Sequence, residues 1–146
     1  MKTDVLDAQQ QVDIKVFSGK TNLVSNKIIN EVERMKLVNY NDVKLELPKE
    51  KGIKDVKLRW LISEKDSAKN FAMRLFEIKP SGYTPLHQHD WEHEVFILEG
   101  EGNIYNKNEK KPFNQGDVLF IKPMEWHQFI NNGKKLLKFL CLIPIK

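Results

Sequence analysis

The chain has 146 residues, 40% hydrophobic and 30% charged, which is typical of a globular domain that needs no disulfide to fold. Its net charge of +4 comes mainly from lysines, and no basic stripe interleaved with aromatic residues argues for nucleic-acid binding. No run reaches the roughly 20 apolar residues of a membrane span, and the N-terminus resembles no secretory signal, so with its single cysteine, Cys141, the protein is expected in the cytoplasm.

The first 42 residues differ from the rest of the chain. The stretch "VDIKVFSG" over 12–19 alternates apolar and polar residues, which predicts a strand that ends at a turn. The stretch "SNKIINEVERMKLV" over 25–38 has apolar residues at helical spacing, with Ser25 or Asn26 as the N-cap. We expect residues 1–42 to form an extension that packs on its own domain or across a dimer.

From residue 43 onward the pattern indicates an all-β domain. Short runs rich in β-branched and aromatic residues alternate with glycine, asparagine and proline turns, which favours a sandwich or barrel over 43–146. A polar loop is expected over 63–70, and the third strand is expected to stop at Pro80-Ser81-Gly82. The predicted strands span 43–47, 56–62, 71–79, 93–100, 102–106, 117–122, 126–131 and 135–143.

Three of the four histidines lie within seven positions, and this clustering indicates a metal site. His87, His89 and His93 share parity, so an extended backbone would point all three to one face. A single histidine in a strand is more often structural, but three neutral imidazoles on one face need many partners that a divalent cation supplies at once. Imidazole ligands suit Mn, Fe, Ni, Zn and Cu.

The segment "HQHDWEHEVFILEG" resembles the first motif of the cupin family, G-x5-H-x-H-x(3,4)-E-x6-G. His87 and His89 match its histidines, His93 stands where the family usually has glutamate, and six residues separate it from Gly100. The adjacent Glu94 is a rival for that position, because the family also tolerates four intervening residues. Parity and the spacing to Gly100 favour His93.

The segment "GDVLFIKPMEWHQFIN" resembles the second cupin motif, G-x5-P-x-G-x2-H-x3-N. His127 follows Gly116 by eleven positions and precedes Asn131 with three residues between them. The departures lie in loops: the first motif's glycine comes one position late at Gly82, Pro123 is likewise one late, and Met124 replaces a glycine. The resemblance implies a double-stranded β-helix barrel and, in the family's four-histidine variant, a metal bound by His87, His89, His93 and His127.

Four neutral imidazoles would leave a divalent ion with its full charge, which predicts an anionic small-molecule ligand such as a carboxylate, enolate or oxoanion. The resemblance implies a metal-dependent enzyme, with dioxygenase-type chemistry the first expectation. A non-catalytic binding or sensing module using the same pocket is the alternative, and a purely structural role for the histidines is a third. Cupin-like barrels often pair through their sheets, so we also expect a homodimer.

Overall fold

The structure, a computed structural model, describes residues 35–146. The strand expected over 12–19 lies outside the described residues, as does most of the helix expected over 25–38; residues 35–38 themselves are not helical. The boundary between an extension over 1–42 and a barrel over 43–146 stays a prediction. No helix in this described part is long and apolar enough to cross a membrane.

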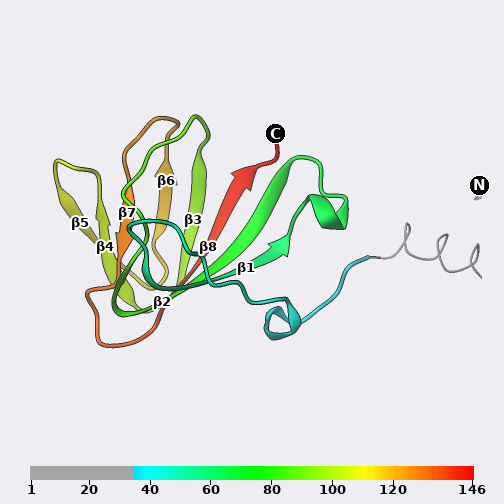
Figure 1. Cartoon of the computed structure of the whole chain (residues 1–146), viewed down its shortest axis with the longest axis horizontal. Helices are drawn as coiled ribbons and strands as arrows, with labels where there is room; N and C mark the ends of the chain where they lie inside the picture. Colours follow the sequence, from blue (N-terminus) through cyan, green and yellow to red (C-terminus); the bar gives the residue numbers. More distant parts are fainter. Residues whose placement is uncertain (1–34) are drawn as a thin grey trace, which may run out of the picture. The chain divides into compact units, whose positions relative to one another are not determined.

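The regular secondary structure of the described chain is antiparallel β-strand apart from two short 3-10 helices, which confirms the all-β prediction. Eight strands form one sheet in the order β5-β4-β7-β2-β8-β3-β6, with β1 paired to β2 beside this path (Figure 1). The strands are β1 (Lys54–Ile62), β2 (Phe71–Tyr83), β3 (His93–Glu99), β4 (Glu101–Tyr105), β5 (Lys110–Asn114), β6 (Val118–Ile121), β7 (Gln128–Ile130) and β8 (Leu137–Pro144), and two short 3-10 helices are η1 (Tyr40–Asp42) and η2 (Glu64–Asp66).

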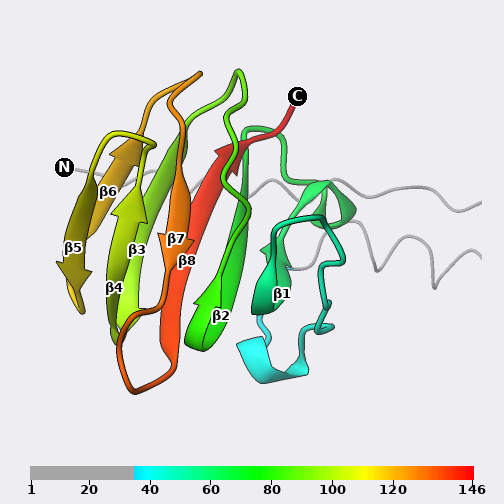
Figure 2. The ribbon, with the colours of Figure 1, turned by 60° about the vertical axis from the view of Figure 1, so that its left-hand side comes forward.

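The sheet curls over, so that β5, β4 and β7 lie across from β6, β3 and β8 (Figure 2). Side chains from the two halves meet in an aromatic core. Phe129 on β7 stacks on Phe139 on β8 with ring centroids 4.5 Å apart, and Phe113 on β5 lies 6.1 Å from Phe129. All three are at most 3% exposed, and burying a side chain of this size contributes about 1.5–3 kcal/mol.

The third predicted strand is longer than expected, because Pro80-Ser81-Gly82 does not end it. β2 continues through these residues to Tyr83, with Ser81 at a φ of 65° and an irregular register opposite Lys54. The Ser81 amide still donates to the carbonyl of Asn131 at 2.9 Å. A Cβ on Gly82 would lie 2.7 Å from the Lys54 carbonyl oxygen, so only glycine fits where the strand bends.

Three other segments depart from the sequence-based expectation. Residues 43–47 do not form the predicted strand; Glu46 alone makes a bridge, to Leu58 on β1. β5 was not predicted, because its sequence "KKPFN" is polar and contains Pro112, which is tolerated where the strand pairs on one side only, with β4. The predicted polar loop over 63–70 contains η2, which is stabilised by a capping box between Ser63 and Asp66.

Candidate metal centre

The backbone brings His87 and His127 together from segments forty residues apart. The amide of His87 donates to the carbonyl of His127 at 3.2 Å, and the amide of His127 donates back at 2.9 Å. The carbonyl of His89, in the turn that follows, accepts a 2.7 Å bond from the Met124 amide. His93 is the first residue of β3. Two chain segments are thus joined by main-chain bonds next to every histidine.

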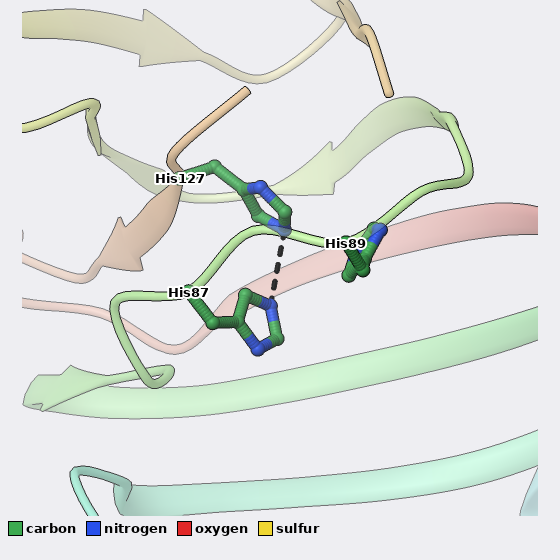
Figure 3. Close-up of side chains that lie close together, drawn as sticks. All are labelled: His87, His89 and His127. Atoms are coloured by element: carbon green, nitrogen blue, oxygen red, sulfur yellow. Dashed lines mark hydrogen bonds between the residues drawn. The ribbon is translucent and has the colours of Figure 1, made fainter. Parts of the chain in front are cut away.

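The imidazole rings of the four histidines lie close together. The Nε2 atoms of His87 and His127 are 3.1 Å apart (Figure 3), and those of His89 and His93 are 2.6 Å apart. One nitrogen from each of His87, His89 and His127 lies within 4.8 Å of the others; His93 is not part of this group of three and adjoins it through its contact with His89. Ligand nitrogens at about 2.1 Å from a metal lie roughly 3 Å apart in neighbouring coordination positions, so this spacing fits a single ion.

The second ring nitrogens set the tautomers. Nδ1 of His89 bonds the Trp91 carbonyl and Nδ1 of His127 bonds the Glu125 carbonyl, both at 2.9 Å. A carbonyl only accepts, so each Nδ1 carries the proton and each Nε2 presents a lone pair. Such bonds are the usual support of metal-binding histidines. The donor set therefore fits a transition metal.

Burial keeps the imidazoles neutral. His93 and His127 are 6% and 2% exposed. Burial, with smaller contributions from the charges of Arg74 and neighbouring histidines, lowers the pKa of His93 to about 2. The pKa of His87 falls to about 4, again mainly through burial, and burial also lowers the pKa values of His89 and His127. Neutral rings at pH 7 are ready to bind a cation without first losing a proton.

The rival residue Glu94 faces the other way. Its side chain is exposed and borders a shallow pocket with Glu92, Asn70 and Leu142, whereas His93 is buried against the other rings. The alternation of side chains along β3 produces this difference. The geometry favours His93 over Glu94 as a ligand, and the four-histidine ligand set stays a prediction.

The comparisons with known proteins identify the family. Residues 74–143 match the cupin domain. An oxalate-binding protein from Thermotoga maritima is 35% identical over 96 residues, which cover 63% of this chain and 78% of that protein. The chain belongs to the cupin family.

Two further relatives of this cupin are matched over different shares of their length. The structure of the polyketide cyclase RemF from Streptomyces resistomycificus superposes with a TM-score of 0.73 and 35% identity, over 77% of this chain and 81% of that one. A 1-methylthio-D-xylulose 5-phosphate methylsulfurylase from Rhodospirillum rubrum is 32% identical over 71 residues, which cover 49% of this chain. The match spans only 46% of that protein's length.

The cupin barrel holds a cavity of about 150 Å³ beside the histidines. Phe76, Phe129 and Phe139 line it together with His87, His93 and His127. Two further lining residues, Arg74 and Cys141, were not singled out from the sequence as site residues. Cys141 is buried at 1% exposure, and its sulfur lies 3.0 Å from Nδ1 of His93.

One signal in the sequence could have marked Arg74. It has the same parity along β2 as Ala72 and Ile78, which are both buried. An arginine on the inward face of a strand is rarely placed there without a partner.

Trp91, adjacent to the histidines, stacks on His89 with ring centroids 3.9 Å apart and an angle of 4° between the planes.

Proposed function

We propose that this cupin binds one divalent transition-metal ion through His87, His89, His93 and His127 and uses it to act on a small acidic molecule. The observation that carries the proposal is the convergence of the four imidazoles, with lone pairs on Nε2 of His89 and His127 directed into the cluster. The ion is Mn, Fe, Ni, Zn or Cu, because imidazole binds all of these.

The charge balance supports an anionic ligand. Neutral imidazoles leave the charge of a divalent ion uncompensated, and an anion gains most from such a centre inside a cavity of low dielectric constant. The name of the Thermotoga maritima relative, an oxalate-binding protein, points the same way. A carboxylate, enolate or oxoanion is the ligand class that we propose.

For the reaction, we propose dioxygenase-type or related Lewis-acid chemistry. A bound metal would polarise the ligand and offer open coordination positions. The protein's own contribution is to orient the imidazoles and to line the cavity with aromatic rings that exclude water. Among the lining residues from the described part of the chain, Glu50 is the only carboxylate, and it is exposed.

The second candidate is a binding or sensing module that uses the same pocket without turnover. It is favoured by the scarcity of proton-transferring groups among the described lining residues, where Glu50 is the single carboxylate and burial raises the pKa of the Cys141 thiol. A buried thiol with a raised pKa is a poor base or nucleophile at neutral pH.

Elemental analysis of protein purified without a histidine tag tests the metal proposal, with about one ion per chain expected. Calorimetry on the loaded protein then compares dicarboxylates with neutral sugars, and only the acids should bind well. Oxygen uptake and product formation with a panel of carboxylates separate the two candidates. Tight binding of an acid with no turnover would favour the sensing module, and substoichiometric metal under every loading condition would contradict both.

We further propose a cytoplasmic homodimer. The outer faces of β3 and β6 carry Phe96, Val118 and Phe120, which are 44%, 75% and 57% exposed, and Phe96 lies opposite Val118 in the sheet. Exposed apolar side chains gathered on two paired strands favour an interface. Sedimentation at micromolar concentration should give twice the mass of the 17.2 kDa chain, and a purely monomeric species would contradict the proposal.

A further inference from the structure

Arg74 occupies a central place in the wall of the cavity. In the sheet it lies between Trp60 on β1 and Cys141 on β8. Its guanidinium carbon is 5.5 Å from the centre of the Trp60 ring and 5.1 Å from that of Phe76. Stacking of this kind holds the guanidinium plane in place.

The guanidinium is connected to the histidine cluster through one sulfur atom. Nη2 of Arg74 donates to Sγ of Cys141 at 3.0 Å, and the same sulfur lies 3.0 Å from Nδ1 of His93. Arg74 therefore belongs to the wall nearest the proposed metal. The positive charge of a guanidinium persists at every physiological pH, so it acts on whatever occupies the cavity.

The positive charge of Arg74 has no negative partner among the described residues. The five ion pairs of residues 35–146 involve other side chains, and the Nε–H of Arg74, which is buried, has no hydrogen-bond acceptor. Glu50 lines the same cavity, but it is exposed and makes no ion pair with Arg74. The side chain as a whole is half-buried. A cation partly removed from water without a counter-charge is costly, and an arginine kept for structure alone normally bonds carboxylates or carbonyls. Its one hydrogen bond here is to a weakly accepting thiol.

The cavity limits the size of the ligand. Its volume is about 150 Å³. A cavity of that volume accommodates a molecule of about six non-hydrogen atoms, such as benzene. The rings of Phe76, Phe129 and Phe139 close part of its wall, so a longer ligand would have to extend past them or out of the opening.

We propose that Arg74 is the specificity-determining residue of this pocket and selects a short dicarboxylate of about six non-hydrogen atoms. The proposal rests on the metal function proposed above. One carboxylate faces the histidine cluster and its ion, and the other pairs with the guanidinium of Arg74, the geometry that arginine prefers for carboxylates. Two cationic centres lining the same small cavity thus favour a dianion over a monoanion or a neutral molecule.

Three molecules of nearly equal shape test the proposal: oxalate is a dianion, oxamate a monoanion and oxamide neutral. Calorimetry on the metal-loaded full-length protein should rank oxalate above oxamate and oxamate above oxamide. Arg74→Gln should lower the affinity for oxalate at least tenfold and change that for oxamide by less than threefold. Arg74→Lys keeps the charge but loses the planar fork, so its affinity for oxalate should lie between those of the wild type and Arg74→Gln. Metal content is measured before and after each titration.

Arg59→Gln is the matched control. Arg59 lies on β1 and pairs with Glu77 at 2.7 Å, and it does not line the cavity. This variant should bind oxalate like the wild type. A second measurement needs no variant: wild-type affinity should fall from oxalate and malonate to the longer succinate and glutarate.

The outcomes separate this proposal from the metal function. Wild-type protein that takes up no metal would contradict the metal function, and the role of Arg74 with it. Metal-loaded wild type and Arg74→Gln with equal affinity for oxalate would overturn the role of Arg74 and leave the metal function standing. If Arg74→Gln does not fold, the wild-type protein still tests the role of Arg74. Equal wild-type affinities for oxamide and oxalate, or for glutarate and oxalate, would overturn that role.

Discussion

At the scale of single residues, the histidines differ in what holds them. The imidazoles of His89 and His127 donate to main-chain carbonyls, whereas Nδ1 of His93 lies against the thiol of Cys141. Carbonyls are strong acceptors that fix one tautomer, and a thiol is a weaker partner that can accept or donate. The orientation of His93 therefore depends more on its burial, at 6% exposure, than on its hydrogen bond.

His93→Ala and Glu94→Ala should separate the two rival ligands. We expect His93→Ala to weaken binding of the ion at least tenfold, because it removes a buried donor 2.6 Å from Nε2 of His89. Glu94→Ala should leave affinity within twofold, because its side chain is exposed on the opposite face of β3. Competition of each purified variant with a zinc indicator measures the dissociation constant of the ion for both variants. A larger loss in Glu94→Ala than in His93→Ala would contradict the four-histidine set.

The sequence revealed the histidines more readily than the residues around them. Spacing alone singled out His87, His89 and His93, although the reason given was incomplete: residues 84–92 are not one extended strand, and the rings converge through the bridge between His87 and His127. The parity of Arg74 marks it as an inward-facing residue, but its place beside Cys141 depends on the pairing of β2 with β8, which no local pattern encodes.

At the scale of elements, the bend in β2 and the turn before β8 are joined by one buried side chain. Asn131 is fully buried; its Nδ2 donates to the carbonyls of Ile78 at 2.8 Å and Lys135 at 2.9 Å, and its Oδ1 accepts from the Gly133 amide at 3.0 Å. The family pattern marked Asn131, but its role as a link between β2, β7 and β8 required the fold. Strand positions were predictable where side chains alternate, and the polar β5 was not.

Asn131→Ala should lower the free energy of unfolding by about 2–4 kcal/mol, because it leaves buried main-chain groups without partners. Asn131→Asp should be nearly as damaging, since a carboxylate cannot donate to Ile78 and Lys135. Urea unfolding followed by tryptophan fluorescence measures both. The exposed neighbour gives a matched control: Asn132→Ala should stay within about 0.5 kcal/mol of the wild type. Equal stability of the two alanine variants would show that the Asn131 bonds contribute nothing net.

At the scale of the whole molecule, folding and metal binding share the same four rings. The curled sheet buries imidazoles that would be hydrated in the unfolded chain, and a bound ion would offset that cost by binding the native state alone. At a free metal concentration about 1,000 times the dissociation constant, such binding adds roughly 4 kcal/mol to stability. The cupin fold was predictable from two motifs and the repeated short strands, whereas residues 1–34 lie outside the described structure.

The metal-free protein should therefore lose stability as the pH falls from 7 to 5. Below about pH 6.5 the unfolded chain protonates its histidines, while the folded pKa values of His93, about 2, and His87, about 4, keep these rings neutral. The unfolded state then binds more protons, so the free energy of unfolding decreases with falling pH across this window. For the well-buried His93 alone the loss at pH 5 is about 2 kcal/mol, at 1.36 kcal/mol per pH unit. Urea unfolding of chelator-treated protein at pH 7 and at pH 5 measures this loss in the free energy of unfolding. His93→Gln removes one titrating ring and should show a smaller loss; a wild-type stability that is unchanged between pH 7 and pH 5 would mean that the imidazoles are not buried as neutral groups.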